Sequence, residues 1–166
     1  MSETKRVAVL GGGPIGIEAA LFAARRGYDV QVFERGRVGE NVRSWGHVTL
    51  FSAWELNRSP WGEDLLREQG VELAASDVFP TGADYVEHYL SPLAGHELLA
   101  GRVNEQTEVL GVSRAHALKG DFIANAERGA APFLVMTQDS SGAEHYVEAD
   151  VVIDVTGSYS LPNALG

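Results

Sequence analysis

The chain has 166 residues, a formal net charge of −10 and no cysteine. This is the size of one globular domain, and a hydrophobic content of 45% is ordinary for such a domain. Excess negative charge argues against a nucleic-acid or anionic-membrane partner, because both require a basic face. The absence of cysteine excludes disulfides and zinc–thiolate sites. Residues 1–46 nevertheless carry seven Lys or Arg against five Asp or Glu, which either marks a local anion site or arises by chance.

The first residues superficially resemble a targeting segment, since Lys5 and Arg6 precede an apolar run. Three glycines, a proline and Glu18 interrupt that run, and it falls short of the roughly 20 apolar residues that span a bilayer. The sequence therefore predicts a cytoplasmic protein without transmembrane spans.

The N-terminal third predicts a strand–helix–strand unit. A β-branched apolar run at 6–10 ends in three glycines, helical spacing of apolar residues follows over 14–26, and a second apolar run occupies 29–33. Gly27 is placed to end the helix. Short connections between these elements imply two parallel neighbouring strands joined by a right-handed crossover.

The remainder predicts a long structured loop followed by helices and then strands. Residues 35–59 show no clear period and are expected to contain at most short helical turns. Thr81 and Asp84 form a capping-box pattern at the start of a helix that Pro92 is expected to kink. The other expected elements are a short helix at 62–69, a strand at 108–113, a hairpin from strands 133–137 and 144–147, and a last apolar strand at 150–155.

The segment from Gly11 to Gly16 satisfies the G-x-G-x-x-G pattern between a strand and a helix. Gly11 would make the tight turn, Gly13 would admit a pyrophosphate, and Gly16 would let the helix pack closely, with Pro14 and Ile15 opening that helix. Glu34 ends the second strand, where an acid accepts hydrogen bonds from a ribose and repels a 2′-phosphate, so NADP is the least favoured occupant. The alternative is a glycine-rich turn without a ligand.

On these residues the sequence resembles the flavoprotein oxidoreductases with a Rossmann-type FAD domain, which include pyridine nucleotide-dependent reductases and flavin monooxygenases. Residues 7–20 with Glu34 and Arg35 resemble the FAD form of the fingerprint, and residues 150–157 resemble the family's strand ending in Ala-Thr-Gly, with Val155 in place of Ala. The strand around Val109 is placed like the family's segment whose backbone meets adenine. The hairpin resembles the small antiparallel meander of these domains.

The resemblance implies an α/β fold: a Rossmann-like parallel sheet with a small antiparallel β-meander, in a three-layer FAD/NAD(P)-binding domain over residues 1–166. It favours FAD as the cofactor, with NAD as the alternative. Arg43 is the candidate phosphate partner, and Trp45 belongs to a loop expected beside the pyrophosphate and flavin. The residues implied in cofactor binding are Gly11, Gly13, Pro14, Ile15, Gly16, Glu34, Arg35, Arg43, Trp45, Val109, Thr156 and Gly157.

Family members supply a further acidic Gly-Asp segment that completes the FAD domain, and this sequence contains none. A second G-x-G-x-x-G is also missing. We therefore expect an incomplete domain: the first segment of a larger flavoenzyme, as a truncation, a split gene or a small homologue. An incomplete domain predicts an uncovered sheet edge or face, and with it self-association or a partner segment.

No residue is predicted to be catalytic, and the five histidines lack metal-ligand spacing. The resemblance implies an FAD-dependent oxidoreductase whose flavin carries out the redox step, with NAD(P)H or a small-molecule substrate as further partners. One alternative is a non-catalytic adenine-nucleotide-binding or assembly subunit that depends on another chain. A fragment of an NAD-binding dehydrogenase is a third possibility, which the Thr-Gly strand and the hairpin disfavour.

Overall fold

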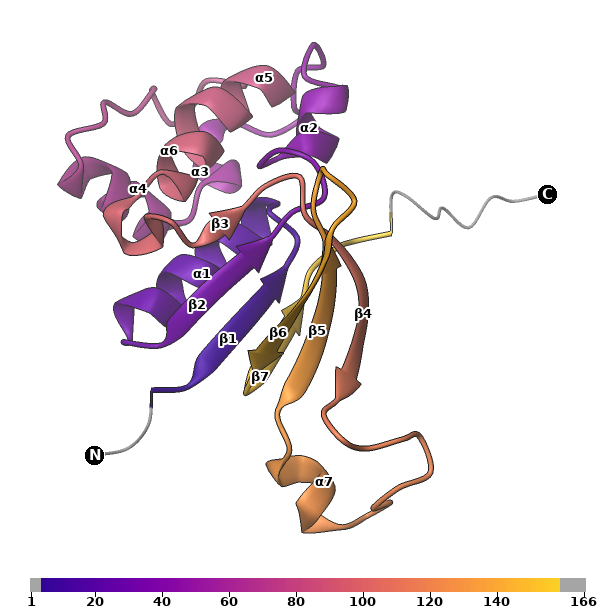
Figure 1. The fold of residues 1–166 in the computed structure, drawn as a ribbon. Helices are drawn as coiled ribbons and strands as arrows, with labels where there is room; N and C mark the ends of the chain where they lie inside the picture. The colour runs from indigo at the N-terminus through magenta and orange to yellow at the C-terminus, as the bar shows by residue number, and fades with distance from the viewer. Residues whose placement is uncertain (1–3, 159–166) are drawn as a thin grey trace.

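A parallel sheet forms the middle layer of the protein in a computed structural model that describes residues 4–158 (Figure 1). Its strand order is β3-β2-β1-β7 within these residues. Its strands are β1 (Arg6–Leu10), β2 (Asp29–Phe33), β3 (Val103–Asn104) and β7 (Val151–Asp154). The ends of the expected 1–166 domain, residues 1–3 and 159–166, lie outside the described residues.

Helices cover one face of this sheet, with α1 (Pro14–Arg25) directly against it (Figure 1). The helical layer continues with α2 (Glu40–Ser44), α3 (Trp54–Asn57), α4 (Pro60–Glu68), α5 (Gly82–Tyr85), the π-helical turn η1 (Val86–Leu90), α6 (Ser91–Ala94) and the 3-10 turn η2 (Glu97–Leu99). Within residues 4–158, no helix is long and apolar enough to cross a membrane.

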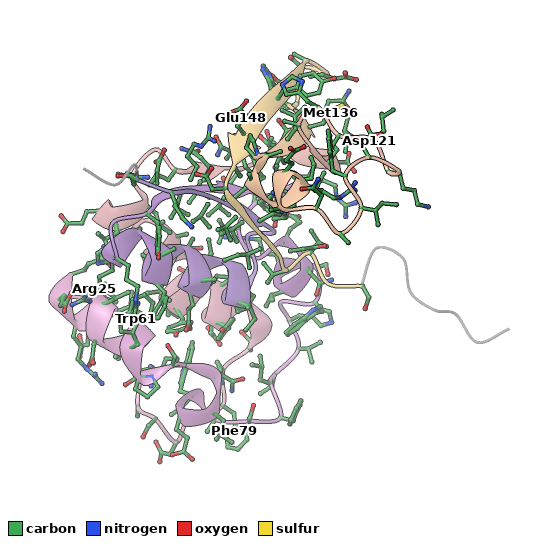
Figure 2. All side chains as sticks on the ribbon, turned by 90° about the horizontal axis from the view of Figure 1, so that it is seen from below. Arg25, Trp61, Phe79, Asp121, Met136 and Glu148 are labelled. Carbon is green, nitrogen blue, oxygen red and sulfur yellow. The ribbon has the colours of Figure 1, made fainter. Side chains whose placement is uncertain are left out.

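A second, antiparallel sheet covers the opposite face of the parallel sheet. Its strands, in the order β4-β5-β6, are β4 (Glu108–Arg114), β5 (Phe133–Gln138) and β6 (Glu144–Ala149), and α7 (Ala126–Ala130) lies in the connection from β4 to β5. Figure 2 shows Met136 and Glu148 of this sheet on one side of the molecule, and Trp61 and Phe79 of the helical layer on the other. The fold thus has the three layers that the resemblance implied.

Alternating side chains of β1 join these layers into two cores. Val7 and Val9 belong to the apolar cluster shared with α1, whereas Ala8 and Leu10 pack with Val135 of the second sheet. Successive residues of a strand point to opposite faces, so one short run with apolar residues on both faces holds a layer on each side.

The predicted elements are confirmed with small shifts at their ends. The first two strands have the predicted bounds, the first helix ends one residue earlier, and the helix expected at 62–69 begins at Pro60. The meander and the capping box of Thr81 and Asp84 are present. The helix after this box passes through a π-helical turn before Pro92, where a proline removes an N–H donor. β3 and α7 were not among the elements predicted from the sequence.

Tyr89 is fully buried in this π-helical turn, and its hydroxyl group connects the turn by hydrogen bonds to α1 and to the start of α4. Its hydroxyl donates to Glu18 Oε1 of α1 at 2.6 Å and accepts from the backbone N–H of Ser59 at 3.0 Å, immediately before α4. Burial, with the hydrogen bond to Glu18, raises the pKa of Tyr89 to about 12. The neutral phenol that makes both bonds is therefore retained into alkaline solution.

We expect Tyr89→Phe to lower the free energy of unfolding by about 1–3 kcal/mol, because it leaves a carboxylate and an amide without their partner. Urea unfolding at neutral pH measures this, with Tyr28→Phe, whose residue is 41% exposed, as the matched control. A raised pKa in the folded state means that the contribution is present below pH 10, the ordinary tyrosine value, and is lost as pH rises through about 12. Equal losses in the two variants would contradict this role.

Candidate functional site

A cavity of about 1030 Å³ opens at the carboxyl ends of the parallel strands. This is where open α/β sheets bind ligands. Five segments from all three layers contribute to it. Its lining residues are Gly11, Gly13, Pro14, Ile15, Glu34, Arg35, Gly36, Arg37, Gly39, Glu40, Asn41, Val42, Ser44, Trp45, Gln106, Glu108, Gln138, Asp139, Ser140, Val155, Thr156 and Gly157.

The glycine turn between β1 and α1 forms the floor of the cavity, and its glycines differ in their surroundings. Gly11 has a φ of +109°, and a Cβ added there would lie 2.9 Å from the Val155 carbonyl oxygen. A Cβ on Gly16 would overlap the carbonyl oxygen of Gly11. A Cβ on Gly13 would meet no protein atom within 4 Å. The fold therefore requires glycine at positions 11 and 16, whereas the open space at Gly13 belongs to the cavity.

The N-terminus of α1 faces this space. Gly13 caps the helix without a side-chain hydrogen bond, and Pro14 occupies its first turn. The first N–H groups of a helix have no partner within the helix and carry a partial positive charge. These amides and the open position at Gly13 give the cavity the properties of an anion site.

Glu34, at the end of β2, clamps the glycine turn from the other side. Its Oε2 accepts from the backbone N–H of Gly12 at 2.6 Å, and its Oε1 accepts from that of Gly36 at 2.8 Å. A Cβ on Gly12 would lie 2.9 Å from the Glu34 Cβ. A carboxylate has about four acceptor positions, so both oxygens can still accept bonds from a ligand. Gly12 was not among the predicted site residues, although the run of three glycines contained the signal.

Trp45, Thr156 and Gly157 also line the cavity. Trp45 follows α2, and its indole Nε1 approaches Asn41 Oδ1 at 3.4 Å. Thr156 donates through both its backbone N–H and its hydroxyl to Asp154 Oδ1, and Gly157 has a φ of +69°. These bonds shape the turn after β7 next to the glycine turn.

Gly16, Arg43 and Val109 are the predicted residues that do not line the cavity. The Arg43 guanidinium donates to the Val38 carbonyl oxygen at 2.9 Å and to Ser91 Oγ at 3.1 Å, and it lines a smaller hollow beside α5 and α6. Val109 packs against the apolar cluster between the two sheets, while its neighbour Glu108 reaches the cavity.

Several cavity residues were not among the predicted site residues, although some of them belong to the loop that was expected beside the pyrophosphate and flavin. Arg37 and Glu40 form an ion pair at 3.2 Å, and the Arg37 backbone and side-chain hydrogen bonds lower the pKa of the Glu40 carboxyl. Gln106 has a left-handed backbone with a φ of +52°, a conformation that non-glycine residues adopt rarely and often at functional positions. The other lining residues outside the predicted set are Gly36, Gly39, Asn41, Val42, Ser44, Glu108, Gln138, Asp139, Ser140 and Val155.

The glycine turn, the clamping acid and the cavity together define a dinucleotide-binding α/β domain. Over residues 8–166 the chain matches the model of the pyridine nucleotide-disulphide oxidoreductase family, and it belongs to that family.

The chain is similar to parts of larger proteins. The multifunctional alkene reductase/demethylase OYE of Caballeronia cordobensis is 28% identical over 179 residues, which cover 97% of this chain and 24% of that protein. Cinnamate reductase of Clostridium sporogenes is 38% identical over 72 residues, covering 43% of this chain and 11% of that protein. The chain therefore spans about a quarter of the length of the first of these relatives.

Solved structures share the fold. Bacillithiol disulfide reductase from Staphylococcus aureus has a TM-score of 0.66 at 23% identity, over 99% of this chain and 42% of that one. OTEMO in complex with FAD and NADP has a TM-score of 0.66 at 16% identity, over 95% of this chain and 26% of that one. At such identities the likeness shows the α/β fold with its small antiparallel sheet.

We expect Gly16→Ala to destabilise the fold by at least about 2 kcal/mol, because the new methyl group overlaps backbone. Gly13→Ala makes the same chemical change in open space and should cost about 1 kcal/mol or less, the loss of a good N-cap residue. Chemical unfolding of the two variants measures the difference. Equal stability of both would refute the close packing of α1 on the turn.

Proposed function

We propose that residues 1–166 form the FAD-binding domain of an oxidoreductase, with the ADP half of the cofactor on the glycine turn. The observation that carries this proposal is that Gly13, the N-terminus of α1 and Glu34 all open onto the same cavity. The cavity also exceeds slightly the roughly 300–1,000 Å³ range usual for small-molecule sites, which suits a large dinucleotide.

Each part of the site has a proposed role. The amides at the start of α1 and the space at Gly13 would hold the pyrophosphate, and Glu34 would accept bonds from the adenosine ribose. Thr156, Gly157 and Trp45 would lie on the flavin side. Bound FAD would supply the two-electron redox chemistry, while the protein binds and orients it. Gly11, Pro14, Ile15 and Arg35 complete the proposed site, and Gly16 supports it by letting α1 pack against the glycine turn.

Arg43 has no phosphate role in this proposal. Its guanidinium is engaged by Val38 and Ser91 and would have to give up both partners to reach the cavity.

The complete reaction needs partners beyond this cavity. Electrons would come from NAD(P)H or a small-molecule substrate and pass to oxygen or another acceptor. An apolar groove of about 870 Å³ beside the edge strand β7, lined in part by Phe22 and Tyr28, supports a homo-oligomer or a further polypeptide segment on that side. The globular composition without cysteine supports a cytoplasmic location.

Cofactor retention tests the proposal directly. The purified chain is loaded with FAD, passed through gel filtration and examined for flavin absorption, while ADP and NAD are titrated by calorimetry. Flavin that stays with the protein is the expected result. A colourless protein that binds ADP would instead favour a non-catalytic nucleotide-binding subunit, binding of NAD alone would favour a dehydrogenase fragment, and no binding of any of them would refute a nucleotide site.

We expect Gly13→Val to weaken ADP and FAD binding by about tenfold or more, because the side chain fills the space proposed for the pyrophosphate. Its backbone φ of −80° suits valine, and no protein atom lies near the added Cβ, so the fold should persist. Circular dichroism verifies folding and calorimetry measures affinity. Unchanged affinity in the folded variant would show that the turn does not hold the pyrophosphate.

We expect Glu34→Ala to cost about 1–3 kcal/mol of ADP binding, the range for hydrogen bonds to a charged group. The variant should also lose stability, because the amides of Gly12 and Gly36 lose their acceptor. Titration of folded protein with ADP separates the two effects, and Glu55→Ala on α3, outside the cavity, is the control. Equal ADP affinities for these two variants would remove the ribose role.

A further inference from the structure

Three aromatic side chains that can lose one electron lie in a row inside the helical layer. The rings of Trp54, the first residue of α3, and Tyr85, the last residue of α5, are stacked with their centroids 6.0 Å apart. The ring of Tyr89 follows, 5.4 Å from that of Tyr85. All three residues are at most 8% exposed, and none of them lines the cavity of the glycine turn. The proposed function gives this aromatic row no role.

A proton acceptor stands at the Tyr89 end of the aromatic row. The Tyr89 hydroxyl donates to the Glu18 carboxylate at 2.6 Å, which is the length of a charge-assisted O–H···O bond. Glu18 also lines the apolar groove of about 870 Å³ beside β7, so its carboxylate is accessible from outside the helical layer. A proton received by Glu18 therefore has a path to water.

Oxidation of Tyr89 would drive its proton onto this acceptor. In the resting protein the proton stays on Tyr89, because the pKa of its hydroxyl is about 12, far above that of a carboxylic acid. Loss of one electron reverses the order, since an oxidised phenol is a strong acid. The proton can then cross the existing hydrogen bond to Glu18 Oε1 without movement of heavy atoms. The backbone N–H of Ser59, 3.0 Å from the Tyr89 oxygen, can still donate to it.

The charges at the two ends give the aromatic row a direction. At the Trp54 end, the Arg58 guanidinium lies 4.8 Å from the ring centre and is paired with Glu63 at 3.0 Å, so the local charge is balanced. At the Tyr89 end, the hydrogen-bonded Glu18 carboxylate is negative. The positive charge left by removal of an electron is therefore stabilised at Tyr89. Tyr85 lies between the two ends, and burial raises the pKa of its hydroxyl, so it retains its proton and acts as a bridge.

We propose that Tyr89 is a one-electron redox site, to which an oxidising equivalent passes from Trp54 through Tyr85 while Glu18 takes the hydroxyl proton. A one-electron oxidant, such as an oxygen-derived radical, takes an electron from Trp54 and is itself reduced. One electron then passes from Tyr89 to Trp54 and restores the indole. The Tyr89 O–H bond breaks and an O–H bond forms on Glu18, which leaves a neutral phenoxyl radical and a neutral carboxyl group. The proposal does not depend on a cofactor in the cavity.

Transient absorption of a chain with one tryptophan tests the proposal. The sequence has three tryptophans, so Trp45→Phe with Trp61→Phe leaves Trp54 alone. A laser pulse at the long-wavelength edge of the indole absorption ejects an electron from Trp54, and a dissolved scavenger takes up that electron. We expect tryptophanyl absorption to decay while tyrosyl absorption grows, at a rate independent of protein concentration. The transfer should be slower in D2O, because a proton moves with the electron.

Two variants of this single-tryptophan chain identify the radical site and its base. Glu18→Gln keeps an oxygen that accepts the Tyr89 hydrogen bond but removes the basic group. The transfer should then slow by about a hundredfold, the lower end of what a positioned base contributes. Tyr89→Phe removes the electron donor, so the tyrosyl absorption should be lost.

Two controls change the same residue types away from the aromatic row. Tyr28→Phe alters a tyrosine that is 41% exposed, and Glu68→Gln alters a carboxylate that pairs with Arg25 at the surface. Both should leave the transfer rate within about twofold of that of the single-tryptophan chain, since a rate change of that size corresponds to well under 1 kcal/mol of barrier.

The outcomes decide between a redox role and a purely structural one. A tryptophanyl radical that decays without tyrosyl absorption would overturn the proposal, and so would tyrosyl absorption that persists in Tyr89→Phe. An unchanged rate in Glu18→Gln would also overturn it, because a structural hydrogen bond survives that substitution whereas proton transfer does not. Circular dichroism verifies that each variant is folded, and Glu18→Gln decides the question if the loss of the Tyr89 hydroxyl unfolds the chain.

Discussion

The close contact between α1 and the turn that precedes it is the constraint on which the site depends. Gly16 has no side chain, so the first turn of the helix lies against the carbonyl oxygen of Gly11. The left-handed backbone of Gly11 in turn brings the chain against Val155 at the end of β7. These two backbone contacts bring a helix N-terminus and two strand ends together, and the cavity opens there.

The parallel sheet supports this arrangement because both of its faces are apolar. β1 gives Val9 to the helical layer and Leu10 to the second sheet, so layers on opposite sides are held to the same strand. One end of the helical layer and one end of the second sheet then lie beside the carboxyl ends of β1 and β2. α2 closes the cavity from one side, and the β5–β6 turn closes it from the other.

The parts of the site that could be predicted are those in which sequence neighbours make the geometry. The glycine turn and Glu34 belong to one strand–helix–strand unit whose short connections leave few arrangements. Arg43 shows the limit: a cationic residue in the right loop points to Val38 and Ser91 instead. Its direction depends on α6, far along the chain, and no local pattern contains that information.

By itself the sequence determined the strand–helix–strand unit, the meander and the Thr-Gly strand, because apolar period, glycine placement and capping residues act over a few neighbouring positions. Only the tertiary structure decided that Val103–Asn104 becomes an edge strand through pairing with β2, and that Gln138 reaches the cavity of Gly13. Both depend on packing between segments some 70 to 125 residues apart, where the free energy comes from burial and backbone pairing that no local residue pattern encodes.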